Sequence, residues 1–138
     1  MPAMRTTPPL ILIIDDDDSV RRLLVRMSQH LAPHCEVVEL ERSIEVLTEV
    51  AARQVSLVIA DYNMPDLNGI ELAQAVKAAS PATQVAIISG LGGGYVAREA
   101  KAAAAEYFLN KPLSMSELTQ ILERSVPPCR STSPDAAS

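Results

Sequence analysis

The sequence contains few aromatic side chains: there is no tryptophan, and there are one phenylalanine and three tyrosines among 138 residues. Hydrophobic residues nevertheless make up 48% of the chain, which is enough for a sizeable core. That core must therefore be aliphatic, built from leucine, isoleucine, valine and alanine. A chain of this length is typical of one domain, because domains cluster at roughly 100–150 residues.

Cysteine, basic charge and long apolar runs are also scarce. The two cysteines, Cys35 and Cys129, are too few and too far apart for a disulfide framework or a zinc site, so we expect reduced thiols. The net charge of −5 argues against a nucleic-acid-binding surface, which would cluster lysine and arginine. The sequence has no run of about 18 apolar residues that would predict a membrane span. Because the N-terminal residues also lack the apolar segment of a signal peptide, we expect a cytoplasmic protein.

Five short apolar runs alternate with segments of helical periodicity. The runs are LILII (10–14), CEVVEL (35–40), VSLVIA (55–60), QVAII (84–88) and YFLN (107–110). The first helical pattern has Asp18 or Ser19 as its expected N-cap. Further patterns cover about 43–53, 69–79 and 95–105, and the last helix follows a capping box that begins at Ser114.

This alternation predicts an α/β fold, with a parallel sheet of five strands covered by helices on both faces. The two ends of the chain have a different composition. Residues 1–9 are rich in proline and threonine, and residues 127–138 are rich in proline and small polar residues. We therefore expect flexible tails at both ends of a single domain that covers residues 10–126.

Polar side chains follow four of the five predicted strands. Four consecutive aspartates, residues 15–18, follow the first strand; Asp61 follows the third, Ser89 the fourth, and Lys111 closes the fifth. In a parallel sheet these ends meet at one edge, where sites form. Converging carboxylates repel one another unless they share a cation, and oxygen ligands alone suit a hard ion such as Mg²⁺. Such an ion can bridge a phosphate, Lys111 can contact phosphate oxygens, and a carboxylate can act as a nucleophile.

Four stretches, LIIDDDDSVRRLL, LVIADYNMPDLNG, VAIISG and YFLNKP, resemble the signatures of bacterial response-regulator receiver domains, in the family's order and approximate spacing. The resemblance covers about residues 10–125. It implies a doubly wound, flavodoxin-like sheet with strand order 2-1-3-4-5 and five helices. It also implies a signalling domain of a two-component or phosphorelay system, which catalyses only its own phosphorylation and dephosphorylation.

The resemblance implies a role for each matching residue. Asp61 matches the aspartate that accepts a phosphoryl group from a histidine kinase or phosphotransfer protein. Asp15 and Asp16 match the acidic pair that binds Mg²⁺, with Asp16 expected to ligate the ion directly and Asp15 through water. Asn63 matches the residue whose backbone carbonyl binds the metal, and Lys111 matches the lysine that contacts the phosphoryl group. Ser89 and Phe108 match the hydroxyl and the aromatic residue of the conformational switch. Pro112 matches a proline whose preceding peptide bond is typically cis in this fold.

Two other interpretations of the aspartate run stay open. Asp17 and Asp18 are expected to act as cap and dipole partners of the first helix, since anions favour a helix N-terminus. The letters DDDDSV also fit the D-x-D-x-[ST]-V motif of haloacid-dehalogenase-like phosphatases, in which Asp15 would be the nucleophile and Asp17 the general acid/base. That alternative leaves ADYNMPDLNG unexplained, and few acidic residues follow Lys111 to supply that family's last motif.

The resemblance further implies an output surface on the fourth helix, fifth strand and fifth helix, about residues 95–126. A downstream protein or a second copy of the chain is the expected partner there. The segment AKAAAAE of the fourth helix is rich in alanine, and we expect it to leave a shallow apolar surface. Charge is expected there only from Arg98, Glu99, Lys101 and Glu106.

Overall fold

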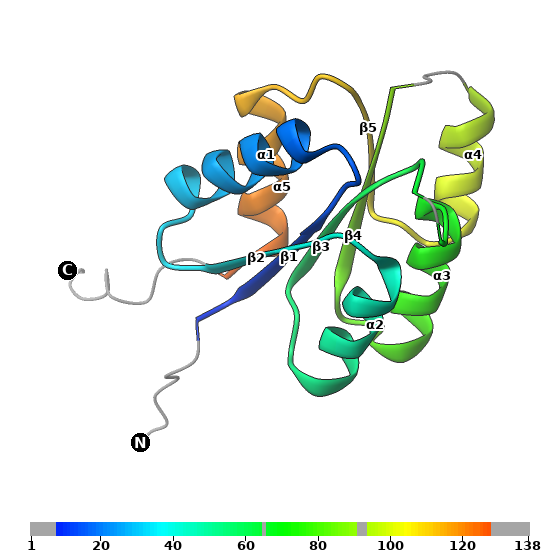
Figure 1. Ribbon diagram of the computed structural model, residues 1–138, viewed down its shortest axis with the longest axis horizontal. Coiled ribbons are helices and arrows are strands. Elements are labelled where there is room, and N and C mark those ends of the chain that lie inside the picture. Colours follow the sequence, from blue (N-terminus) through cyan, green and yellow to red (C-terminus); the bar gives the residue numbers. More distant parts are fainter. Residues whose placement is uncertain (1–7, 65, 91–93, 128–138) are drawn as a thin grey trace.

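The computed structural model describes residues 8–64, 66–90 and 94–127, with the backbone alone at 94–97. Within this part of the chain five strands alternate with five helices (Figure 1). The predicted tails fall mostly outside it. The strands are β1 (Leu10–Ile14), β2 (Glu36–Leu40), β3 (Leu57–Asp61), β4 (Gln84–Ser89) and β5 (Tyr107–Asn110), and the helices are α1 (Asp18–Leu31), α2 (Ser43–Ala52), α3 (Gly69–Ala79), α4 (Gly94–Ala102) and α5 (Met115–Ser125).

The sheet is parallel throughout, and its strands lie in the order β2-β1-β3-β4-β5. This confirms the predicted order. β1 and β3 are buried along their whole length and β4 almost so, which explains why they appear in the sequence as continuous aliphatic runs. The edge strands β2 and β5 are largely half-buried. The order brings the carboxyl ends of β1, β3 and β4 together at the centre of one sheet edge.

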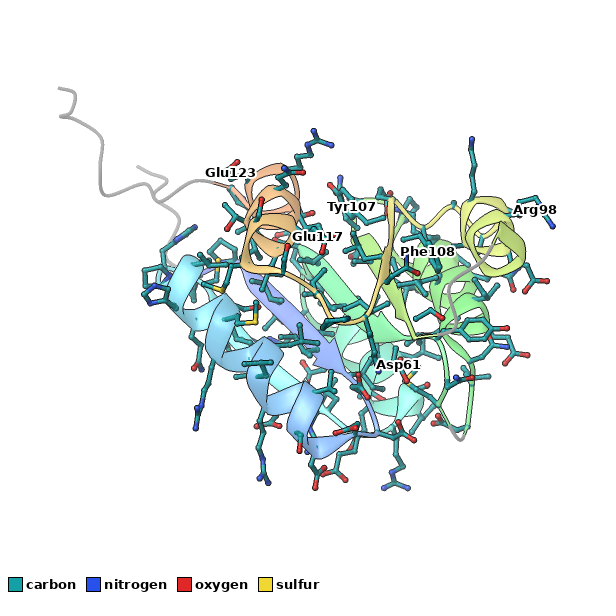
Figure 2. The ribbon with its side chains drawn as sticks, turned by 90° about the horizontal axis from the view of Figure 1, so that it is seen from above. Asp61, Arg98, Tyr107, Phe108, Glu117 and Glu123 are labelled. Atoms are coloured by element: carbon teal, nitrogen blue, oxygen red, sulfur yellow. The ribbon has the colours of Figure 1, made fainter. Side chains whose placement is uncertain are left out.

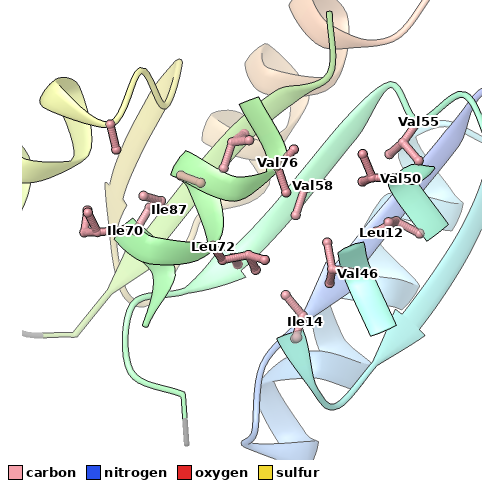
Figure 3. Packing of buried hydrophobic residues seen from close by; sticks show 14 of the residues in the cluster. Leu12, Ile14, Val46, Val50, Val55, Val58, Ile70, Leu72, Val76 and Ile87 are labelled. Carbon is pink, nitrogen blue, oxygen red and sulfur yellow. The ribbon is translucent and has the colours of Figure 1, made fainter. Parts of the chain in front are cut away.

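Helices α1 and α5 cover one face of the sheet, and α2, α3 and α4 cover the other (Figure 1). Alternate residues of β1 point into the two layers: Leu12 packs with α2 and α3, and Ile13 packs with α1 and α5. Figure 3 shows the first layer, where valine and leucine side chains of the helices meet those of the strands. The predicted aliphatic core is confirmed. No helix in the described part of the chain is long and apolar enough to cross a membrane.

The capping signals at the helix N-termini are largely those that the sequence predicts. Ser114 caps α5 and Glu117 completes the capping box. The N-cap of α1 is Asp17, whose carboxylate accepts hydrogen bonds from two main-chain N–H groups. This agrees with the cap role expected of Asp17, whereas Asp18 or Ser19 as the N-cap residue is wrong. Any of these side chains can cap a helix, and the path of the chain out of β1 decides which one does. Asp18 lies in the first turn, as expected of a dipole partner.

The segment after α4 departs from the predicted helix of 95–105. Two of its alanines, Ala100 and Ala103, are buried against the sheet, so the apolar alanine surface is smaller than predicted. Glu106 lies beyond α4 and is not a charge on the helix surface. Its carboxylate binds the ammonium of Lys77 in α3 and accepts a hydrogen bond from the main-chain N–H of Val85. Glu106 therefore connects the segment before β5 to α3 and β4.

The turn that ends α4 holds an alanine in an unfavourable backbone conformation. The helix ends at Ala102, and Ala104 has a φ of 66°, in the left-handed region. A Cβ atom costs about 1–2 kcal/mol there. Ala104→Gly is therefore expected to raise the free energy of unfolding by about 0.5–1 kcal/mol, after allowance for the greater entropy of unfolded glycine. In urea unfolding the exposed helical control Ala102→Gly should instead destabilise. If Ala104→Gly destabilised the protein as Ala102→Gly does, backbone strain at Ala104 would be contradicted.

Candidate functional site

Four strand ends bring their polar side chains to one edge of the sheet. Asp61 is the last residue of β3 and Ser89 the last residue of β4, while Asp15 directly follows β1 and Lys111 directly follows β5. Figure 2 shows Asp61 at this carboxyl edge. The main-chain N–H of Lys111 donates to the carbonyl of Ser89 at 2.9 Å, which extends the pairing of β4 and β5 up to the site. The pairing of the strands therefore fixes the backbone position from which each of these side chains extends.

Three carboxylates converge at this edge. One oxygen each from Asp15, Asp16 and Asp61 lies within 4.8 Å of the others. Asp15 and Asp61 are buried, whereas Asp16 is exposed to solvent. The predicted convergence is confirmed. Oxygens at this spacing can share one ion with ligand bonds of about 2.1 Å after small side-chain movements.

The ammonium group of Lys111 lies between the two buried carboxylates. Its Nζ is 2.9 Å from Oδ1 of Asp61 and 3.2 Å from Oδ2 of Asp15. The peptide bond between Lys111 and Pro112 is cis, as predicted. With three carboxylates and one ammonium, the cluster carries more negative than positive charge.

Asp15 shows that the cluster fits a cation. Its Oδ1 accepts a hydrogen bond from the main-chain N–H of Asp17 at 2.9 Å. Within the described residues its Oδ2 is buried and has no hydrogen-bond partner, although it forms an ion pair with the Lys111 ammonium at 3.2 Å. A buried carboxylate oxygen without a hydrogen bond is costly. Carboxylate oxygens with no histidine or thiolate suit a hard divalent cation such as Mg²⁺.

Burial and the neighbouring charges shift the pKa of both Asp61 and Lys111. Burial raises the pKa of Asp61 above the ordinary carboxyl value; the hydrogen bond from Lys111 works against this rise, and repulsion from Asp15 adds to it. For Lys111, burial works to lower the pKa, but the hydrogen bond to Asp61 and the attraction of Asp15 raise it overall. The lysine thus stays protonated, and it does not fully offset the carboxylates.

The other predicted site residues lie in three different environments. Ser89 is 1% exposed at the end of β4. Asn63 is exposed in the loop after β3. Phe108 is half-buried in β5 and packs against the core layer covered by α2, α3 and α4. The roles of these three residues in metal binding and switching stay predictions.

The structure shows contacts of two residues that lie inside the quoted motifs but to which the sequence alone assigns no role. The guanidinium of Arg21 in α1 donates to the main-chain carbonyl of Asp15 at 2.9 Å. The carboxylate of Asp66, in the loop after β3, accepts from the N–H of Ser43 at the start of α2, at 2.8 Å. Arg21 has a local signal, because it lies at helical ion-pair spacing from Asp18. Asp66 has none, because its partner is distant in the sequence.

Gly69 at the start of α3 lies against the backbone that carries Asp61. A Cβ atom at position 69 would be 2.9 Å from the carbonyl oxygen of Asp61 and 3.0 Å from Cα of Tyr62. Gly69→Ala must therefore move this backbone, and we expect it to destabilise the protein by about 1–3 kcal/mol in urea unfolding. Gly90→Ala is the matched control, because among the described residues its Cβ would meet only the Lys111 side chain, at 4.0 Å. Equal effects of the two variants would contradict the close approach.

Comparison with known proteins agrees with this geometry. The sequence model described as "Response regulator receiver domain" matches residues 11–123. The chain belongs to this family. Receiver domains are signalling domains of two-component response regulators, and the match favours this interpretation over the phosphatase alternative.

The curated relatives are longer proteins than this chain. The uncharacterized transcriptional regulatory protein YesN of Bacillus subtilis is 33% identical over 79 residues, which are 57% of this chain and 22% of YesN. The DNA-binding transcriptional regulator NtrC of Azospirillum brasilense is 33% identical over 88 residues, which are 64% of this chain and 18% of NtrC. The receiver chain thus spans about a fifth of the length of these relatives.

Solved structures support the fold over most of the receiver chain. The chemotaxis protein CheY4 of Vibrio cholerae is 25% identical with a TM-score of 0.77, and the similarity covers 87% of this chain and 100% of CheY4. The signal receiver domain of the response regulator NarL from Mycobacterium tuberculosis is 23% identical with a TM-score of 0.77, and 86% of this chain and 96% of that one are covered. The strand order and helix arrangement of this receiver are therefore shared with structures of low sequence identity.

Proposed function

We propose that this receiver domain is the phosphoacceptor of a two-component or phosphorelay system and that Asp61 is the residue phosphorylated. The donor is the phosphohistidine of a histidine kinase or phosphotransfer protein, and Mg²⁺ is the cofactor. The observation that supports this most directly is the position of Lys111, whose ammonium contacts Asp61 and Asp15 beside a third carboxylate. A nucleophile, a cation site and a phosphate-binding group then lie together at one sheet edge.

In the proposed reaction a carboxylate oxygen of Asp61 attacks the phosphorus atom. The P–N bond of the phosphohistidine breaks, its electron pair returns to the imidazole nitrogen, and an acyl phosphate forms on Asp61. Lys111, now 2.9 Å from Oδ1 of Asp61, is near enough to donate to a phosphoryl oxygen. The hydroxyl of Ser89 donates to another, and its movement together with Phe108 is the proposed switch.

Asp15, Asp16 and Asp61 are the proposed side-chain positions of the Mg²⁺ site, with the main-chain carbonyl of Asn63 as a further ligand. We expect Asp16 to bind directly and Asp15 through water. When bound, the ion would offset the negative charge of the carboxylates and of the phosphoryl oxygens. The charge of the cluster supports this assignment, because the one ammonium of Lys111 faces three carboxylates.

We place the receiver domain at residues 10–126, with residues 1–9 and 127–138 as tails, and we place it in the cytoplasm, where histidine kinases draw their phosphoryl group from ATP. The proposed output surface consists of α4, β5 and α5, and its partner is a downstream protein or a second copy of the chain. Met115 at the start of α5 is an exposed large apolar side chain, consistent with a contact surface.

Labelling with acetyl phosphate, a small phosphoryl donor, tests this function. The purified protein should gain one phosphoryl group when Mg²⁺ is present and none in EDTA, as measured by intact mass. Peptide mapping after borohydride reduction of the acyl phosphate should locate the group on Asp61. A label on Asp15 would support the phosphatase chemistry instead. Failure of acetyl phosphate and of a histidine kinase to label the protein would contradict the proposal.

A further inference from the structure

Arg21 carries a buried positive charge beside the acidic loop, which we define as residues 15–17 between β1 and α1. Its side chain is only 4% exposed, although it lies in a helix whose next residue, Arg22, is exposed. All three guanidinium nitrogens have partners. Nη1 donates to the carbonyl oxygen of Asp15 at 2.9 Å, Nε donates to Glu39 at 2.8 Å, and Nη2 donates to Asp18 at 2.7 Å and lies 3.6 Å from Glu41.

These contacts join three separate segments of the chain. Asp15 leaves β1, Asp18 begins α1, and Glu39 belongs to the edge strand β2. Burial of a guanidinium is costly unless its donors are satisfied, so the arginine is held where its partners converge. The planar fork of arginine can serve these partners at once, whereas the single ammonium of a lysine cannot. Arg21 therefore holds the acidic loop against β2.

Asp15 is consequently held from two sides. Arg21 binds its main-chain carbonyl, and Lys111 lies 3.2 Å from its carboxylate. The other carboxylate oxygen of Asp15 accepts from the N–H of Asp17, the residue that caps α1. A displacement of the Asp15 carbonyl would thus move the carboxylate relative to Asp61. Within the described part of the chain, Arg21 makes no hydrogen bond or ion pair with Asp61, so its influence on the site passes through the backbone of Asp15.

We propose that Arg21 is a positioning residue of the metal site: it fixes the loop of Asp15 and Asp16 against β2 and thereby sets the affinity for a divalent cation. This inference rests on the proposed function, because it concerns the same site. Arg21 contacts neither the ion nor the phosphoryl group in this account. It is the outer partner of a metal-binding residue, and loss of such a partner typically weakens metal binding 10–100-fold.

Charge and geometry make opposite predictions for this arginine. A cation near the acidic cluster repels an incoming metal ion, so an effect of charge alone would make Arg21→Met bind metal more tightly. An effect of geometry makes the same variant bind more weakly. Arg21→Lys separates the effect of charge from the effect of geometry, because it keeps the positive charge and loses the planar guanidinium group. Positioning predicts weaker binding for both variants.

The experiment measures Mn²⁺ affinity of the full chain by electron paramagnetic resonance, with Mg²⁺ competition to report the natural ion. Arg21→Met and Arg21→Lys should each weaken Mn²⁺ binding by about tenfold. Arg22→Met, which removes an exposed arginine one residue away, should leave it unchanged. Hydrogen exchange in metal-free protein gives a second readout: the Asp17 amide should exchange faster in Arg21→Met than in the wild type.

Glu39→Ala keeps the inference testable if Arg21→Met does not fold. Glu39 is 44% exposed, so its loss should be tolerated, and it removes one anchor of the guanidinium. Glu39→Ala should weaken Mn²⁺ binding by less than Arg21→Lys does. The double variant Glu39→Ala/Arg21→Lys should lose less binding free energy than the sum of the losses of the two single variants. Unchanged or tighter Mn²⁺ binding in the Arg21 variants would overturn the positioning role and leave the proposed function intact. Absence of Mn²⁺ binding by the wild type would overturn both.

Discussion

Asp61→Asn is expected to abolish phosphoryl labelling and, without metal, to make the protein more stable. Asparagine has nearly the same shape but cannot form an acyl phosphate. It also removes a negative charge that burial and repulsion from Asp15 disfavour in the folded protein. The free energy of unfolding at neutral pH should rise by about 1 kcal/mol in urea denaturation without Mg²⁺.

The size of this effect depends on pH in a defined way. Because the pKa of Asp61 is raised from 3.8, the folded protein binds this proton more tightly than the unfolded chain does. The wild type therefore loses stability as the pH rises from about 4 through the raised pKa. The advantage of Asp61→Asn should grow over that window and then stay constant. An advantage that shrinks as the pH rises would contradict the account.

Asp15→Asn is the matched control for the labelling experiment, because it removes the other buried carboxylate of the site. It takes away a proposed metal position but keeps the proposed nucleophile. Labelling by acetyl phosphate should therefore persist at reduced rate and require more Mg²⁺. If Asp61→Asn were labelled like the wild type while Asp15→Asn was not, Asp15 would be the nucleophile, as in the phosphatase alternative.

Lys111→Met is expected to produce the second large effect, a metal-free protein less stable by about 1–3 kcal/mol. The substitution leaves Asp15 and Asp61 buried without the ammonium that contacts both. The expected loss of stability is smaller than for a fully buried ion pair, because the side chain of Lys111 is 25% exposed. Thermal or urea unfolding with and without Mg²⁺ measures it. Mg²⁺ should recover more stability in the variant than in the wild type, because the ion offsets the same carboxylates.

The pH dependence of Lys111→Met provides its internal check. Without the ammonium, less opposes the rise in the pKa of Asp61, so the loss of stability should increase as the pH rises from about 4 to 7. In the wild type the contribution of Lys111 should disappear only above pH 10.5, since its own pKa is raised from that value. Lys101→Met, which removes an exposed lysine of α4, should be nearly neutral. Equal losses of stability in Lys111→Met and Lys101→Met would contradict a specific role for the ion pairs of Lys111 with Asp15 and Asp61.

The fold was predictable because the central strands are buried on both faces. β1 and β3 therefore had to be aliphatic throughout, and their ends were marked by the first charged residues after each run. Once parallel strands were expected, the rule that their carboxyl ends share an edge was enough to bring Asp15, Asp61 and Lys111 together. The strand order itself came from the resemblance to receiver domains.

What the sequence could not predict depends on contacts between distant segments or on choices among equivalent residues. The N-cap of α1 was misassigned because neighbouring aspartates cap equally well, and Asp17 is selected by the chain path after β1. The end of α4 was misplaced because Ala104 adopts a conformation usually left to glycine. Arg21 and Glu39 are far apart in the sequence, so nothing local indicates that they jointly hold the loop of Asp15.

A crystal structure with Mg²⁺ and beryllium fluoride, which mimics an acyl phosphate, tests the central assignment most directly. In this protein we expect beryllium fluoride on a carboxylate oxygen of Asp61, in contact with Lys111 and Ser89, and the ion beside Asp15 and Asp16. Beryllium fluoride bound to Asp15, or an ion located away from these three aspartates, would contradict the assignment of Asp61 as the phosphoacceptor.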